Sequence, residues 1–267
     1  MNIQANVQRF ADAVIFDLGR QLRWSFLPPL MVYFAAGCSG LTLIVGTFFV
    51  KEYLDFSAAY IAGLAFWAGL PWALKMPLGH LVDLIWRWKW LLVWLGAGCV
   101  AASVFIIYLV LTRTEMMEAL MPVASWYILS YILAPCGLVL QDAVADAMSV
   151  EAVPLTDMAG APLPEEDVKN AHVTMQTLGR FALISGTVAV ALLNIALFSG
   201  IDALSQEQKS LVYARVYATA LLIPVISVSG VVLAGLMRQM SAAPEAKDLD
   251  QPVEVNWWYF IGGGAFV

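Results

Sequence analysis

The sequence predicts an all-α integral membrane protein, and two observations lead to that prediction. Of the 267 residues, 61% are hydrophobic and 13% are charged, whereas about one quarter of the residues in a soluble domain carry charge. The apolar residues also form long runs, and a helix needs roughly 20 such residues to cross a bilayer. We therefore expect a six-helix bundle over residues 28–240. Its spans are predicted at about 28–50, 57–84, 90–112, 120–150, 172–199 and 210–238.

Three further segments flank this bundle. Residues 1–27 carry charges between apolar residues at helical spacing and have no continuous apolar run. This pattern indicates an amphipathic N-terminal segment on the cytoplasmic membrane surface, or alternatively a solvated helix that leads into the first span. Residues 241–255 form a polar linker, and residues 256–267 begin a seventh apolar helix. Because the sequence ends within that helix, we expect a longer chain.

Basic residues set the predicted orientation. With the N-terminus in the cytoplasm, the inner segments hold most of them, and the outer loops hold only Lys51, Arg113 and Lys209. The inner set comprises Arg9, Arg20, Arg23, Arg87, Lys89, Lys169, Arg238 and Lys247. Inner loops are enriched in Lys and Arg, so the sequence predicts a multi-pass protein of the cell (inner) membrane with a cytoplasmic N-terminus.

Three charged residues lie well within the second and fourth predicted spans. Lys75 in the second span and Asp142 in the fourth lie at similar depths, and Asp146 follows Asp142 by one turn on the same helix face. An unpaired charge at the centre of a spanning helix costs about 2.5–3.5 kcal/mol. We therefore expect Lys75 to pair with Asp142 or Asp146. Such a cluster is either a substrate or proton site, or a structural ion pair that closes the bundle.

Other polar residues extend the candidate site. Gln176 and Arg180 are one turn apart near the start of the fifth span, where Arg180 either meets an anionic solute or pairs with Glu151 at the inner mouth. Pro71 and Pro77 flank Lys75 and should bend the second span there. We expect neither a metal site nor a cofactor, since there are two histidines and no Cys/His cluster. The sequence contains no nucleotide-binding loop and no nucleophile elbow, so neither an enzyme nor a nucleic-acid partner is expected.

One loop resembles a known transporter signature. The stretch GHLVD at residues 79–83, followed by Arg87 and Lys89, is similar to the loop 2–3 motif of the major facilitator superfamily, with the basic residues a few positions late. The resemblance implies that Asp83, Arg87 and Glu151 belong to an inner gate. It also implies a twelve-helix fold in two halves, of which this chain is the six-helix N-terminal half plus the start of helix 7.

Two branches of that superfamily look similar to the chain. LPWALK at residues 70–75, together with Asp142, Asp146 and Glu151, resembles elements of the folate–biopterin transporter family. The same acidic element, preceded by Gln141, also resembles the muropeptide permease and acetyl-CoA transporter families. These families are the alternative to the folate–biopterin branch.

The resemblance implies a secondary active transporter, coupled to protons, for an anionic organic solute of folate or pterin type. Lys75 and Arg180, with Gln176 beside them, are then the expected solute contacts, and Asp142 and Asp146 are the coupling acids. The alternatives are a muropeptide importer, a half-transporter that dimerises, and a transporter-derived subunit that acts as an assembly or structural partner in a larger membrane complex. The expected partners are the lipid bilayer, the solute, a proton and, in the last case, another membrane protein.

Overall fold

The computed structural model describes residues 22–50, 54, 56–157, 160–201, 204–240, 255 and 257–258. Within these residues the chain is helical apart from short turns and one isolated bridge between Thr156 and Pro162. Six helical stretches are long and apolar enough to cross a membrane. The protein is therefore an all-α integral membrane protein, as the sequence predicts. The predictions for residues 1–21, for residues 241–254 and for most of 256–267 lie outside the described residues.

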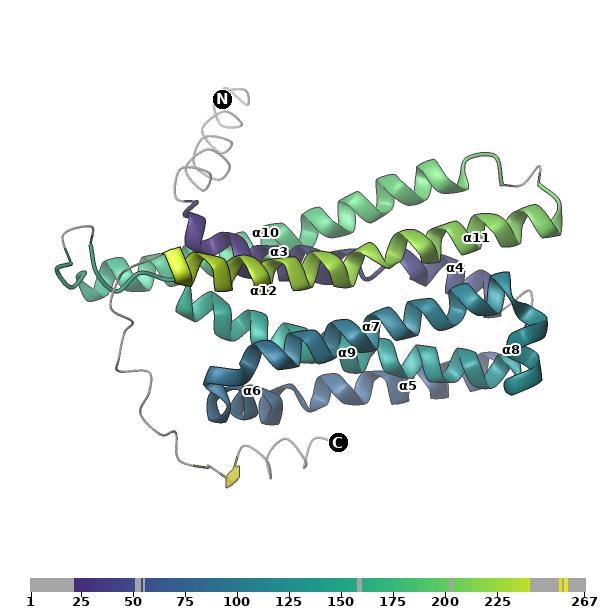
Figure 1. Cartoon of the computed structure of the whole chain (residues 1–267), viewed down its shortest axis with the longest axis horizontal. Helices are drawn as coiled ribbons and strands as arrows, with labels where there is room; N and C mark the ends of the chain where they lie inside the picture. Colours follow the sequence, from purple (N-terminus) through teal and green to yellow (C-terminus); the bar gives the residue numbers. More distant parts are fainter. Residues whose placement is uncertain are drawn as a thin grey trace, which may run out of the picture.

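The spans follow one another as an antiparallel series, and three of them are interrupted (Figure 1). A 3-10 turn, η2 (Trp24–Phe26), leads into the first span. In chain order the spans are α3 (Leu27–Cys38) with α4 (Leu41–Phe49), α5 (Ala58–Ala73) with α6 (Lys75–Leu84), α7 (Lys89–Thr112), α9 (Val123–Glu151), α10 (Glu165–Phe198), and α11 (Gln206–Ala220) with α12 (Leu222–Met240). A 3-10 turn, η4 (Trp86–Trp88), precedes α7, and a short helix, α8 (Thr114–Leu120), joins α7 to α9.

The fifth span begins earlier than the hydropathy pattern predicts, at Glu165 instead of about residue 172. Pro164 caps this helix, and Glu165, Glu166 and Asp167 fill its first turn. Carboxylates are favourable there because they face the partial positive charge of the helix N-terminus. The acidic stretch that looks like loop in the sequence is therefore partly helix.

The helices pack around α3, α7, α9 and α12. Helix α7 lies along α9, while α3 packs against α10 on one side and against α12 and α9 on others. Helices α5 and α6 pack on α9 at one edge of the bundle, and α10 lies at the opposite edge (Figure 1). These two edges are the least covered, because only 6% of the most apolar window of the second span and 11% of that of the fifth are buried.

Small residues bring the central helices together. Gly96 of α7 and Gly137 of α9 face each other so closely that a Cβ on Gly96 would lie 2.5 Å from the carbonyl oxygen of Gly137. Ser103 and Ser130 then join the same two helices, since each hydroxyl donates to the backbone oxygen of the other residue at 2.8 and 2.9 Å. Close backbone approach and buried interhelical hydrogen bonds are typical of packing in membranes, where no hydrophobic effect drives helices together.

Candidate functional site

A break in the second span places Lys75. Helix α5 contains Pro71, and Leu74 leaves helical geometry with φ −83° and ψ 5°, so that α6 begins at Lys75. Pro77 lies in the first turn of α6, where its missing N–H is best tolerated. The span is thus interrupted in the region where the prolines predict a bend, and the interruption falls directly before the lysine. Nine residues separate Lys75 from the end of α6, which places it roughly 13 Å inside the span at 1.5 Å per residue.

Lys75 lies between the two aspartates of α9. Its Nζ is 2.5 Å from Oδ2 of Asp142 and 2.9 Å from Oδ2 of Asp146. The predicted ion pair between the second and fourth spans is confirmed, and Lys75 pairs with both acids instead of one. A third helix contributes Tyr33 of α3, whose hydroxyl donates to Oδ1 of Asp146 at 2.7 Å. We call Lys75, Asp142, Asp146 and Tyr33 the Lys75 network.

Tyr33 also connects this network to α10. Its ring packs against Gly179, where an added Cβ would meet the ring carbons at 3.0 Å. Gly179 directly precedes Arg180 in the sequence. A single tyrosine therefore links the charged centre, made by α6 and α9, to the edge helix that carries the predicted arginine.

The members of the Lys75 network differ in exposure. The Asp142 side chain is 13% exposed, whereas Lys75 is 41% and Asp146 is 50% exposed. The cluster is therefore buried on the Asp142 side and open on the other. In chemical terms it is one cation shared by two acids, of which Asp146 is half exposed.

The other predicted solute contacts are not joined to this cluster by an ion pair or a hydrogen bond. Gln176 and Arg180 are both exposed on α10. Neither forms an ion pair or a side-chain hydrogen bond with another described residue, so the predicted alternative pairing of Arg180 with Glu151 is not made.

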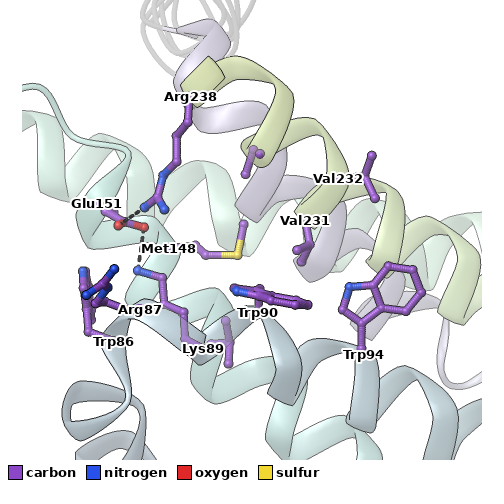
Figure 2. A pocket seen from close by; sticks show the side chains of 13 residues that line it. Trp86, Arg87, Lys89, Trp90, Trp94, Met148, Glu151, Val231, Val232 and Arg238 are labelled. Atoms are coloured by element: carbon purple, nitrogen blue, oxygen red, sulfur yellow. Dashed lines mark hydrogen bonds and ion pairs between the residues drawn. The ribbon is translucent and has the colours of Figure 1, made fainter. Parts of the chain in front are cut away.

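Glu151 belongs to a second charged cluster at the end of the bundle. One carboxylate oxygen lies 2.8 Å from Nζ of Lys89, and the other accepts a hydrogen bond from Arg238 (Figure 2). Lys89 also lies over the ring of Trp86, 3.3 Å from its centroid. We call Glu151, Lys89 and Arg238 the Glu151 network; it joins the ends of α7, α9 and α12. The sequence offers Arg180 as a partner of Glu151 and groups Arg87 with it at the predicted gate, whereas the partners in the structure are Lys89 and Arg238.

Asp83 and Arg87, the remaining predicted gate residues, are both exposed near the same end of the bundle. Arg87 lines the cavity beside the Glu151 network, although it forms no ion pair with the described residues. Asp83 lies near the end of α6 and belongs to neither network. The three predicted gate residues thus lie at one end of the bundle. Among them, only Glu151 forms an ion pair with a described residue.

Sequence reasoning missed Tyr33 and the partnership of Lys89 and Arg238 with Glu151. For Glu151 a signal was present: it follows Asp142 by nine residues, which turns an α-helix by roughly 180°. Glu151 must therefore face away from the Lys75 network, toward other helices. Tyr33 has no such signal, because an uncharged hydroxyl in an apolar run looks like core.

Within the described ranges, no group of three His, Cys, Asp or Glu side chains is placed to hold a metal ion. The charged side chains that the structure brings together instead form ion pairs between helices. The fold and these clusters define a multi-pass membrane protein in which acidic and basic side chains pair between the helices of the bundle.

Comparison with known proteins gives one partial similarity. No family model and no solved structure matches the sequence. A curated folate-biopterin transporter from a Synechocystis species is 35% identical to the chain over 68 residues. These residues are 26% of this chain and 14% of the relative, so the match spans a small part of that protein. Together with the six apolar helices, the match describes a membrane protein that is transporter-like.

Proposed function

We propose that the chain is part of a secondary active transporter for an anionic organic solute of folate or pterin type, coupled to protons. The observation that carries the proposal is the Lys75 network: one cation and two acids from two helices, with Lys75 and Asp142 roughly 13 Å inside their spans and Asp146 one turn nearer the helix end. The partial similarity to a folate-biopterin transporter supports the same class of cargo.

The cost of such a cluster favours a functional role. Charges at the centre of a span cost about 2.5–3.5 kcal/mol each when unpaired, and ionisable groups there commonly mark ion or substrate pathways. A purely structural pair would be best fully paired and buried. Here Asp146 is half exposed, and the cluster holds two acids for one cation.

The charge count suggests how protons and an anion would be coupled. With Lys75 contributing +1 and Asp142 and Asp146 contributing −2, the ionised network carries −1, which repels an anion. Protonation of one acid makes the network neutral and weakens the electrostatic attraction between the acids and Lys75. The ammonium then becomes available to a carboxylate of the solute, so that proton uptake and anion binding favour one another.

The open sides of the bundle provide the surface for a second half. Nearly all residues in the most apolar windows of the second and fifth spans are uncovered. Asp146 and Arg180 are exposed, and Lys75 is partly exposed. Charged groups at this depth need a water-filled cavity or another protein beside them. We propose that a second bundle, resembling the other half of a major facilitator fold, covers these edges and completes the pathway, with Arg180 lining it.

Uptake measurements test the proposal. The full-length protein in proteoliposomes should accumulate folate or a pterin when the outside is more acidic, and Asp142→Asn should abolish this uptake while the protein stays folded. Glu118→Gln is the matched control, because Glu118 is exposed on α8, away from both networks. It removes the same charge and should leave uptake intact.

Two results would refute this function: normal uptake by the Asp142→Asn protein, or accumulation by the wild type that ignores the pH gradient. A second candidate is supported by the uncovered edges alone, namely an assembly subunit that has no transport activity. It predicts recovery of the chain in a stable stoichiometric complex, with no uptake and no thermal shift on adding folate or pterin.

A further inference from the structure

A cavity opens beside the Glu151 network, between η4, α7, α9 and α12. Its volume is about 390 Å³. Figure 2 shows Glu151 between Arg238 and Lys89 at one end of the cavity, with Trp90 and Trp94 farther along it. No part of the proposed transport mechanism uses this space, and its helices are not the uncovered edge helices α5 and α10.

The cavity is polar at one end and apolar at the other. On α12 it runs from Arg238 back to Val231, and on α9 from Glu151 back to Val144, seven residues in each case. At 1.5 Å per residue, the lining changes from charged to apolar over roughly 10 Å, in the direction from the bundle end toward its middle. A ligand that fits must have a charged head and an apolar body aligned with the helices.

The charged end favours an anion. Arg87, Lys89 and Arg238 line it with Glu151 as the single acid, which gives a local charge of +2 in a chain whose net charge is −6. The Lys89 side chain is only 7% exposed. Its Nζ lies 2.8 Å from Oε2 of Glu151. An ammonium carries three N–H donors, so an incoming phosphate oxygen would supply a further, charge-assisted acceptor.

The surrounding tryptophans place this end at a membrane surface. Trp88 and Trp90 are exposed by 58 and 42% respectively, and exposed tryptophans gather at the level of the lipid headgroups. For a lipid at this surface, the phosphate would lie at the depth of Lys89 and Arg238 and the acyl chain at the depth of Val231.

We propose that this cavity is a binding site for an anionic phospholipid. The phosphate is held by Arg87, Lys89 and Arg238, and the upper part of one acyl chain lies along Trp94 and the apolar face of α12. In this position the phosphate competes with Glu151 for Lys89 and Arg238. Lipid binding therefore acts on the contact that joins the ends of α7, α9 and α12.

Native mass spectrometry of the full-length protein, titrated with phosphatidylglycerol or phosphatidylcholine, tests the site. The first phosphatidylglycerol should bind more tightly than phosphatidylcholine, and Arg87→Gln should weaken it about fivefold, since one basic residue near a membrane contributes about 1 kcal/mol. Arg87 is exposed and forms no ion pair with the described residues, so its replacement spares the fold. Arg113→Gln, at the exposed far end of α7, is the matched control and should not change the affinity.

A charge-neutral variant tests the apolar end. Gly235 lines the cavity, and a Cβ there would meet no atom within 4 Å, so Gly235→Phe is the variant chosen to reduce the space available to an acyl chain. It should weaken phosphatidylglycerol binding at least as much as Arg87→Gln does. Equal binding of the two lipids, or equal losses for Arg87→Gln and Arg113→Gln, would overturn the proposal. So would displacement of the lipid by soluble glycerol phosphate at similar concentration, because the site would then recognise a free phosphate ester.

Discussion

Replacement of Lys75 with glutamine removes the cation that two acids share. It leaves Asp142, which is largely buried, and Asp146 one turn away, both without a cation partner. Breaking a fully buried ion pair costs about 3–5 kcal/mol, whereas exposed pairs contribute about 0.2–1 kcal/mol. Since Lys75 is 41% exposed and Asp142 only 13%, the site lies between these limits. We expect Lys75→Gln to lower the free energy of unfolding by about 2 kcal/mol.

The same geometry predicts a smaller loss for Asp142→Asn. In that variant Lys75 still has Asp146 at 2.9 Å, so the ammonium keeps one partner and the repulsion between the acids disappears. The expected cost is about 1 kcal/mol, near the upper end for partly exposed pairs. In the Lys75→Gln background, Asp142→Asn should be stabilising, because it removes one of two uncompensated charges.

Equilibrium unfolding of the four proteins in mixed micelles measures this double-mutant cycle. Lys209→Gln, on α11 and outside both networks, controls for the loss of a positive charge and should change stability by less than about 0.5 kcal/mol. The reasoning fails if Asp142→Asn destabilises the Lys75→Gln protein as much as it destabilises the wild type. The two side chains would then contribute independently to stability, and the coupling free energy between Lys75 and Asp142 would be zero.

Two further predictions concern packing and the bundle end. Gly137→Ala should cost about 1–3 kcal/mol in unfolding measurements, because its Cβ would overlap a backbone oxygen of α7. Gly98→Ala, which meets no atom within 4 Å, should be neutral or slightly stabilising, and equal effects at the two positions would contradict the packing argument. Glu151→Gln should cost about 3 kcal/mol, because it leaves the buried ammonium of Lys89 without its counter-charge. Glu118→Gln on exposed α8 provides the baseline in the same assay, and a loss of similar size there would refute this role of Glu151.

Much of the membrane architecture could be predicted from the sequence because the bilayer imposes a simple rule. Each span needs about 20 apolar residues, so runs of that length reveal the helices directly. The second span was expected at 57–84 and is found at Ala58–Leu84. The rule is weakest where a helix extends beyond the apolar run, as it does at Glu165, since the residues outside the hydrocarbon are polar whether helical or not.

The Lys75 network was partly predictable for a related reason. The depth of a residue along a span can be counted in the sequence, and Lys75 and Asp142 lie at equal depth. Because an unpaired charge inside a span is costly, two opposite charges at the same depth are expected to pair. Depth alone does not give the rotation of each helix about its axis. That rotation decides that Tyr33 of α3 reaches Asp146, and that Lys89 and Arg238 meet Glu151.

Both charged networks depend on one helix. Asp142 and Asp146 lie on one face of α9, and Glu151 lies on roughly the opposite face near its end. A movement of α9 that opens the Lys75 network must therefore also displace Glu151 relative to Lys89. If the chain transports by alternating access, the bundle end and the buried centre respond to the same displacement. In that case an anionic lipid that takes Lys89 from Glu151 would also change the freedom of α9, and with it the ease with which Lys75 leaves its acids.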